Sequence, residues 1–234
     1  MTYPGGKNGE GVWQTIINQM PPHRVYVELF LGSGAVLRRK RPAEGNVGVD
    51  IDPITCAAVQ RLLPTRYRVI NCDALAWLSD FHLKHAAAED VLIYADPPYL
   101  METRSSQRDI YRHEFNTYGE HSALLCLLAT CPAKVILSGY ASSLYEMSTI
   151  SKWRRLDFTA GSRRGPRTES LWMNFPAPAA LHDYRFIGKD RTDRQRIRRK
   201  IARWQSRLAA MPALERGALS QAIAVGDDSR RPQT

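Results

Sequence analysis

Short apolar runs that alternate with longer segments of mixed composition constrain the fold of this chain more than any other feature. The runs fall at residues 25–31, 47–50, 67–71, 91–95, 135–138 and 171–175, and each has the length of a strand. Stretches of helical length, such as residues 53–63 and 121–129, lie between several of them. This alternation predicts an α/β fold, with a mostly parallel sheet and helices on both faces. In such sheets the ligand crevice lies beyond the carboxyl ends of the strands.

Composition narrows the class of partner. The formal net charge is +10, which predicts a polyanionic partner, and nucleic acid is the commonest one. The chain contains no run of about 18 apolar residues, so we expect no membrane span. No apolar signal segment opens the chain, so we expect a cytoplasmic protein. The four cysteines form no CxxC pair, which indicates reduced thiols. The histidines show no metal-ligand pattern, so we expect no metal and place His82 and His85 at the surface.

The C-terminal part differs from the rest. Residues 185–207 contain ten Lys or Arg and two acids. An amphipathic basic helix is predicted there, because four apolar residues recur at helical spacing: Ile197, Ile201, Trp204 and Leu208. Its apolar stripe is expected to dock on the core. Pro212 breaks this helix, and a second one is expected at residues 214–225. We therefore divide the chain into an α/β domain at 1–180, a basic helical extension at 181–225 and a disordered tail at 226–234.

A glycine-rich turn directly follows the first apolar run. Residues 28–34 read Glu-Leu-Phe-Leu-Gly-Ser-Gly. Gly32 and Gly34, on either side of Ser33, let the backbone turn tightly and approach a ligand closely. Between a strand and an expected helix, such a turn predicts a nucleotide-type pocket. The full GxGxxG pattern is absent, which disfavours a dinucleotide.

Acidic residues follow the second and third runs. Asp50 ends the second run, where a carboxylate can accept hydrogen bonds from ribose hydroxyls. Asp52 precedes Pro53 and is predicted to cap a helix. Asp73, beside Ala74, is placed to bind an adenine amino group, and helix capping remains its alternative role.

The fourth run leads into Asp96-Pro97-Pro98-Tyr99. Prolines donate no backbone hydrogen bond and hold a stiff, extended turn. The carboxylate of Asp96 and the carbonyl of Pro97 can therefore both accept from one NH2 group. Held in this way, the nitrogen of an exocyclic amine moves toward tetrahedral geometry and frees its lone pair to attack a sulfonium methyl placed in line. Tyr99 offers a face on which a flipped base can stack.

With these motifs in place, the chain resembles the Dam-like adenine-N6-specific DNA methyltransferases over roughly residues 3–175. Residues 3–7, Tyr-Pro-Gly-Gly-Lys, are similar to the N-terminal motif of that family, and residues 26–30 to the stretch before its glycine turn. Residues 96–99 match its catalytic motif, and residues 169–175 resemble its last strand. The order of the motifs is itself that of the family.

The resemblance implies a Rossmann-like class I methyltransferase fold, S-adenosylmethionine as the cofactor, and duplex DNA with a flipped adenine as the partner. It implies that Asp96, Pro97, Pro98 and Tyr99 are catalytic. Gly6 and Lys7 would approach the methionine end of the cofactor. The residues expected to bind the cofactor are Tyr3, Gly6, Lys7, Glu28, Phe30, Gly32, Ser33, Gly34, Asp50, Asp73, Ala74 and Asp96.

One departure from the family concerns target recognition. Residues 74–95 are too few for the recognition domain that well-known members insert before the catalytic motif, so we expect short or relaxed sequence specificity, as in small phage or prophage enzymes. Cationic residues follow the catalytic turn, occupy the loop at 161–167 and fill the basic helix, and such side chains mainly contact phosphate. Those expected to bind nucleic acid are Arg104, Arg108, Arg112, Arg163, Arg164, Arg167, Arg194, Arg198 and Arg199.

Other functions remain open at this point. An adenine-N6 methyltransferase acting on RNA would share the site. Cytosine-N4 enzymes more often carry Ser in place of Asp96, and protein glutamine methyltransferases typically carry Asn there. A nucleic-acid-binding module without catalysis is the alternative of another class, and the intact Gly32, Gly34, Asp96 and Tyr99 argue against it.

Overall fold

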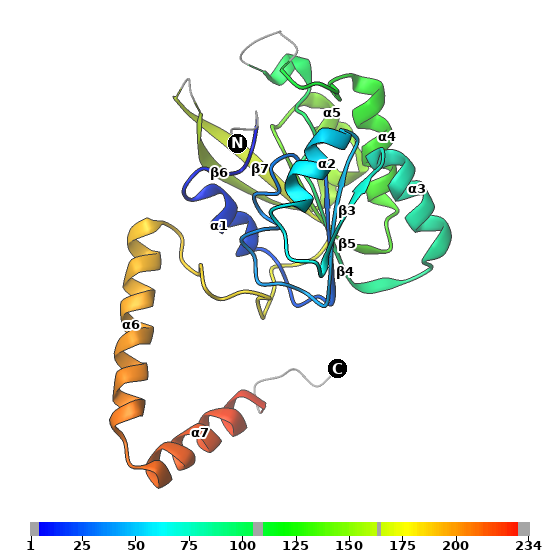
Figure 1. Ribbon diagram of the computed structural model, residues 1–234. Coiled ribbons are helices and arrows are strands. Elements are labelled where there is room, and N and C mark those ends of the chain that lie inside the picture. The colour runs from blue at the N-terminus through cyan, green and yellow to red at the C-terminus, as the bar shows by residue number, and fades with distance from the viewer. Residues whose placement is uncertain (1–4, 105–109, 163–164, 229–234) are drawn as a thin grey trace. The chain divides into compact units, whose positions relative to one another are not determined.

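The computed structural model describes residues 5–104, 110–162 and 165–228 (Figure 1). Contacts divide the chain into two units, the first ending at Phe186 and the second starting at Ile187. Each unit is described by itself. Among the described helices, none is long and apolar enough to cross a membrane.

A seven-stranded sheet forms the first unit, in the order β3-β2-β1-β4-β5-β7-β6. Its strands are β1 (Val25–Leu29), β2 (Gly45–Asp50), β3 (Tyr67–Asn71), β4 (Ala88–Ala95), β5 (Ala133–Gly139), β6 (Arg154–Ser162) and β7 (Gly165–Met173). Strands β1 to β5 pair in parallel, and β7 runs antiparallel to both of its neighbours. The mostly parallel sheet is as predicted, and this strand order with a reversed β7 is that of the Rossmann-like class I methyltransferase fold.

Helices cover both faces of the sheet, as the alternation of apolar runs predicted (Figure 1). One face packs against the longer α3 and α4, and the other against α1, α2 and the turns after the glycine motif. Side chains alternate between the faces along each strand: Val27 and Ile93 belong to the first core, and Tyr26 and Leu92 to the second. The bounds are α1 (Val12–Ile17), α2 (Pro53–Gln60), α3 (Ala74–Lys84), η1 (Met101–Thr103), α4 (Tyr118–Ala129), α5 (Ser143–Met147) and η2 (Thr149–Lys152).

Local signals explain where the helices next to the strand ends begin. The carboxylate of Asp52 accepts from the backbone N–H of Ile54 at 3.0 Å, and Pro53 occupies the first helical position, as predicted. Asp73 caps α3 in the same way, accepting from the backbone N–H of Ala76 at 2.9 Å. Both caps bring an acidic side chain to the carboxyl edge of the sheet.

The structure differs from the predicted elements in four places. Strand β6 was not predicted, and β7 begins at residue 165 instead of 171, so strand takes up most of the loop expected at 161–167. The first strand ends at Leu29 instead of residue 31, because Phe30 has a φ of 55° and leaves the extended conformation. The segment after Gly34 forms a series of turns at residues 35–39 instead of the expected regular helix.

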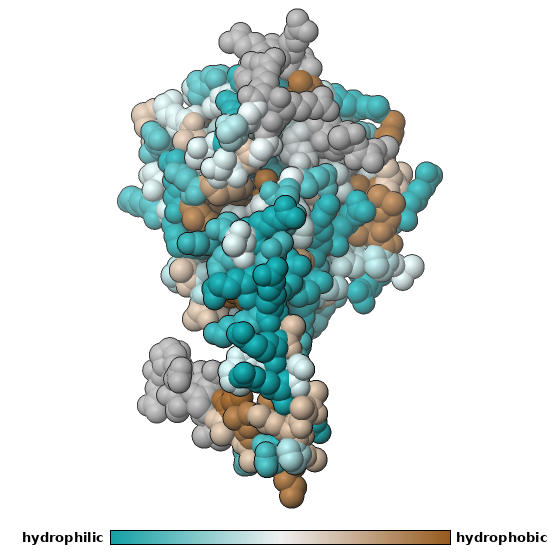
Figure 2. Space-filling view, turned by 90° about the vertical axis from the view of Figure 1, so that its left-hand side faces the viewer, coloured by the Kyte–Doolittle hydropathy of each residue, from teal (hydrophilic) through white to brown (hydrophobic). Residues whose placement is uncertain are grey.

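The second unit consists of α6 (Arg191–Ala210) and α7 (Ala213–Asp228). Pro212 separates them, as predicted, and α7 continues beyond the expected end at residue 225. Figure 2 shows hydrophilic side chains gathered along α6, with more apolar colour on α7. Of the four apolar residues at helical spacing on α6, Ile201 and Trp204 are each 46% exposed, and Ile197 and Leu208 are half-buried. The docking of this stripe on the core stays a prediction.

Candidate functional site

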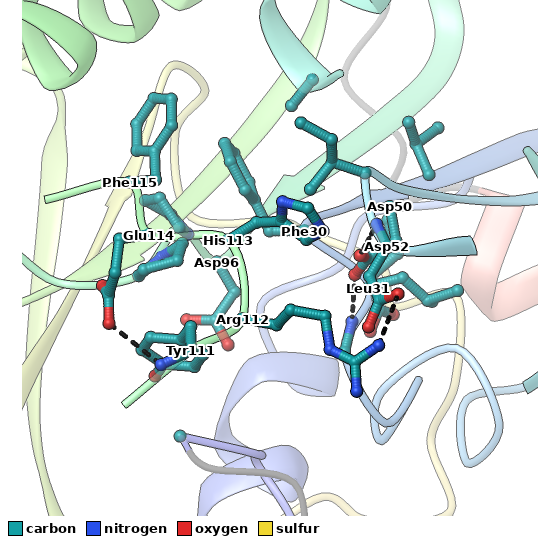
Figure 3. Close-up of a pocket in the computed structure, with 18 of the residues that line it drawn as sticks. Phe30, Leu31, Asp50, Asp52, Asp96, Tyr111, Arg112, His113, Glu114 and Phe115 are labelled. Carbon is teal, nitrogen blue, oxygen red and sulfur yellow. Dashed lines mark hydrogen bonds and ion pairs between the residues drawn. The ribbon is translucent and has the colours of Figure 1, made fainter. Parts of the chain in front are cut away.

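A cavity opens at the carboxyl ends of β1 to β4, where the parallel sheet predicts a ligand crevice (Figure 3). Its empty volume is about 1110 Å³ with the open mouth included. Most residues expected to bind a cofactor or to act in catalysis line it: Gly6, Lys7, Glu28, Phe30, Gly32, Ser33, Asp50, Asp73, Ala74, Asp96, Pro97, Pro98 and Tyr99. Segments far apart in the sequence therefore meet in one cavity.

The glycine turn is tied to the end of β2. The backbone N–H of Gly32 donates to Asp50 Oδ2 at 2.8 Å, and the backbone N–H of Asp52 donates to Asp50 Oδ1 at 2.9 Å. A φ of 50° at Gly32 explains why glycine is favoured there. Gly34 also has a positive φ, 60°, but it does not line the cavity, and a Cβ there would approach Val59 to 3.1 Å. Gly34 was expected to bind the cofactor, but here it allows close packing against Val59 and lies outside the cavity lining.

Asp50 keeps the capacity to accept from a ligand. A carboxylate has about four lone-pair sites, and the two backbone donors use two of them. Burial raises the pKa of Asp50, while the hydrogen bonds from Asp52 and Gly32 oppose this rise. Asp73, the other acid at this edge, both caps α3 and lines the cavity, so its two predicted roles are compatible.

The turn at residues 96–99, directly after β4, is called the catalytic turn below, and it carries a buried charge cluster. The ammonium of Lys7 lies 2.9 Å from Asp96 Oδ1 and 3.3 Å from Glu169 Oε2, and it donates to the hydroxyl of Tyr99. Burial lowers the pKa of Lys7, but the carboxylates of Asp96 and Glu169 outweigh it, so the net shift is upward. Burial raises the pKa of Asp96 to about 6, with Lys7 lowering it and Glu169 raising it.

Lys7 was expected near the methionine end of a cofactor. The structure places its ammonium against the catalytic turn, over the Tyr99 ring at 4.8 Å from the ring centroid, and Lys7 lines the cavity. Its approach to a cofactor stays a prediction. Glu28 lies near the end of β1, and burial raises its pKa to about 8. Glu28 Oε2 accepts from the hydroxyl of Tyr26 at 2.9 Å and from the backbone N–H of Leu37 at 2.6 Å.

Residues 111–115, in the polar segment that follows the catalytic turn, line the cavity. Arg112 and His113 lie toward Asp50 and Asp52, and Tyr111 lies beside Asp96 (Figure 3). The ring of Phe115 packs edge-on against Phe30 at 4.9 Å. The guanidinium of Arg112 reaches to 4.0 Å from Asp52. This segment therefore borders both the nucleotide-type end of the cavity and the catalytic turn.

Several arginines expected to bind nucleic acid are engaged within the protein. Arg104 is the clearest correction, because its side chain is only 5% exposed and pairs with Glu114 at 2.6 Å. Arg167 donates to the carbonyl of Thr103 at 3.1 Å and lies over the ring of Tyr140. In the second unit Arg194 is buried, whereas Arg198 and Arg199 are exposed. The expectations for Tyr3, Arg108, Arg163 and Arg164 lie outside the described residues.

Three side chains at the site were not anticipated in these roles. Glu169, on β7, is the second carboxylate beside Lys7. Tyr140 follows β5 and packs against Tyr99 with ring centroids 4.3 Å apart, so the rule of carboxyl strand ends could have indicated it. His121 lies inside α4, and its Nε2 lies 3.0 Å from the carbonyl of Pro98 in the catalytic turn. This contact depends on how α4 packs, for which the sequence offers no signal.

No metal centre is found among the residues that the structure describes, since no three His, Cys, Asp or Glu side chains cluster suitably. His82 is half-buried instead of lying on the surface, and His85 is exposed as expected. The four cysteines are free thiols.

Comparison with protein-family models and with curated proteins finds no match. Solved structures that match include magnesium protoporphyrin IX methyltransferase from Synechocystis with bound SAM (14% identity, 69% of this chain and 75% of that one, TM-score 0.44). A dimethyladenosine transferase from Plasmodium falciparum matches at 13% identity over 69% and 58% of the two chains, with a TM-score of 0.42. Spermidine synthase from Thermotoga maritima matches at 11% identity over 71% and 61%, with a TM-score of 0.47. These values are too low to support an activity, and the fold assignment rests on the strand order.

Proposed function

We propose that this chain is an S-adenosylmethionine-dependent methyltransferase that transfers a methyl group to the N6 amino group of adenine in DNA. One observation carries the proposal. The cavity joins a glycine turn paired with Asp50, which suits a nucleoside, to the Asp96-Pro97-Pro98-Tyr99 turn, which suits an amine. The two halves of a methyl-transfer site thus share one space.

The described residues fit the cofactor. The turn at Gly32 lets backbone approach the ligand without a Cβ, and Asp50 has free acceptor sites for ribose hydroxyls. Asp73 retains Oδ2 for an adenine amino group, since Oδ1 caps α3. When bound, S-adenosylmethionine supplies an electrophilic methyl group on a sulfonium.

The catalytic turn orients the nucleophile. The carboxylate of Asp96 and the carbonyl of Pro97 accept from the two hydrogens of the amino group, which frees its lone pair for attack on the methyl carbon. Methyl transfer would leave the electron pair of the carbon–sulfur bond on sulfur as a thioether, and the methylated nitrogen would release one proton to solvent. Tyr99, packed against Tyr140, provides an aromatic face for the flipped base.

Nucleic acid is supported as the substrate by charge. Helix α6 carries exposed Arg198, Arg199 and Arg203, which suit phosphate contacts. Between β3 and the catalytic turn there are only α3 and β4, so no recognition domain is inserted there. This arrangement favours short or relaxed sequence specificity, and methylation confined to one strict motif of five or more bases would contradict it.

The deciding experiment incubates the full chain with labelled S-adenosylmethionine and either unmodified DNA or RNA, followed by nucleoside mass spectrometry. N6-methyladenine in DNA is the expected product. Product only in RNA would move the substrate to RNA, and N4-methylcytosine would move it to cytosine. Cofactor binding without any methylated nucleoside would contradict methyl transfer and support the alternative of a nucleic-acid-binding module.

Asp50→Asn is expected to weaken the binding of S-adenosylmethionine. A hydrogen bond to a charged group contributes about 1.5–3 kcal/mol, so the dissociation constant should rise roughly 10- to 100-fold. Isothermal calorimetry measures it, with Asp80→Asn on the exposed face of α3 as the matched control. An unchanged dissociation constant in a folded Asp50→Asn protein would remove Asp50 from the cofactor site.

Replacing Arg198, Arg199 and Arg203 by Gln is expected to raise the KM for DNA without changing the single-turnover rate. Each lost phosphate contact lowers the slope of log affinity against log salt by about 0.9, so the slope should fall by about 2–3. The control replaces Arg61, Arg66 and Arg68, which are exposed near β3, by Gln and removes the same charge. Equal effects of the two triple variants would show that only net charge matters.

A further inference from the structure

The two prolines of the catalytic turn offer no backbone donor. At Pro97 and Pro98, backbone hydrogen bonds can therefore be made only through the carbonyls. The carbonyl of Pro98 lies 3.0 Å from Nε2 of His121, and the carbonyl of Tyr99 accepts from Nε of Arg104 at 2.7 Å. Within the described part of the chain, no side chain or backbone group donates to the carbonyl of Pro97.

His121 is a buried and fully engaged donor. Its side chain lies in α4, is 1% exposed, and its Nε2 also lies 3.1 Å from the carbonyl of Phe115. Both neighbours of Nε2 are carbonyls, which only accept, so Nε2 carries the proton. Nδ1 lies 2.9 Å from the hydroxyl of Tyr145 and accepts from it. Burial lowers the pKa of His121, which keeps the imidazole neutral.

Arg104 holds the next carbonyl from the other side. Its Nη2 pairs with Glu114 Oε2 at 2.6 Å, and Glu114 Oε1 accepts from the backbone N–H groups of Ile110 and Tyr111. The same guanidinium therefore connects the catalytic turn to a segment that lines the cavity. Its burial, at 5% side-chain exposure, fits this internal role better than a phosphate contact.

We infer that His121 and Arg104 are positioning residues that hold the catalytic turn by the carbonyls of Pro98 and Tyr99 and leave the carbonyl of Pro97 as the backbone acceptor for the target amino group. The inference rests on the proposed function. Two side chains that do not touch the substrate thus determine which of the three backbone carbonyls can accept from the target amino group. A displacement of about 1 Å at a reacting group costs about 100-fold in rate.

The first test compares His121→Phe, which keeps a ring but loses the donor, with His121→Gln, which restores one. Single-turnover methyl transfer at saturating cofactor and DNA should fall about 10- to 100-fold in His121→Phe and recover most of that loss in His121→Gln. The dissociation constant for S-adenosylmethionine should stay within about threefold of wild type, since His121 lies outside the cavity lining. His85→Phe is the control, because His85 also stacks on a phenylalanine, Phe81, but is exposed on the far end of α3.

Arg104→Lys tests the second anchor, since lysine keeps the charge beside Glu114 but loses Nε–H. It should lower the same rate with little change in cofactor affinity. Wild-type rates in His121→Phe or in Arg104→Lys would overturn the role of that residue. If wild type itself transfers no methyl group, the proposed function fails instead, so the two failures are distinguishable.

A measurement on the wild-type protein needs neither activity nor a variant. Nitrogen-15 NMR of labelled histidine should show His121 as a neutral ring with the proton on Nε2 across neutral pH. A ring protonated on Nδ1, or one that titrates like an exposed histidine, would overturn the inference even if His121→Phe fails to fold.

Discussion

Replacing Asp96 by alanine is expected to lower the rate of methyl transfer by about 10³-fold or more. The change removes the only charged acceptor that the catalytic turn offers to the amino group. The lone pair of the target nitrogen then stays conjugated with the ring, and the amino group is no longer held in line. The backbone carbonyl of Pro97 remains, but one acceptor cannot fix both hydrogens.

Single-turnover kinetics with labelled cofactor measure this loss, and calorimetry shows whether the cofactor still binds. We expect binding to survive, because the acid at the ribose end, Asp50, is held separately by Gly32 and Asp52. Asp90→Ala is the matched control, since Asp90 lies on the same strand, β4, and its side chain is 70% exposed. A rate for Asp96→Ala within tenfold of wild type would remove Asp96 from catalysis.

Most of the sheet could be predicted because its buried strands are continuous apolar runs. These runs are shorter than a typical helix, and this length marks them as strands. Strand β6 was missed for a physical reason. It lies at the edge of the sheet, and only one of its faces is partly covered: Leu156 and Phe158 are half-buried and alternate with the exposed Arg155 and Asp157. Apolar and polar residues alternate along β6 in the sequence, as in a half-buried strand, but no continuous apolar run marks it.

The part of the site that follows strand ends was also predictable. Asp50, Asp73 and Asp96 each lie at the end of an apolar run or within two residues after it, and a parallel sheet brings such positions together. Arg104 and His121 follow no such rule. Their roles depend on how η1 and α4 pack against the catalytic turn, and neither spacing nor charge reveals a hydrogen bond to a carbonyl.

Lys7→Met and Glu169→Gln are expected to move the pH dependence of methyl transfer in opposite directions. Beside the carbonyl of Pro97, the catalytic turn offers a charged acceptor only while Asp96 is ionised, and burial raises the pKa of Asp96 to about 6. In wild type the rate should therefore fall as the pH drops through about 6. Lys7 lowers that pKa, so its removal shifts the acid limb to higher pH. Glu169 raises it, so Glu169→Gln shifts the limb to lower pH.

The Lys7 change has the larger effect, since it leaves two buried carboxylates without their shared cation. Removing one partner of a buried pair costs about 3–5 kcal/mol of folding free energy, and the limb should move by about one to three pH units. A carboxyl group whose pKa is raised in the folded protein binds protons more tightly there than in the unfolded chain. Stability is therefore lost as the pH rises through that pKa, and Lys7→Met should regain stability as the pH falls.

Rate profiles between pH 5 and 9, with urea unfolding at each pH, separate these effects. Glu169→Gln removes a carboxylate but leaves the ion pair of Lys7 and Asp96 intact. It is therefore the comparison for Lys7→Met, because no buried charge loses its partner in it. Shifts in the same direction for both variants would show that the acid limb does not report Asp96. Opposite shifts would mean that Lys7 and Glu169 set the ionisation of the catalytic carboxylate from opposite sides, so that a single buried lysine keeps Asp96 charged at neutral pH.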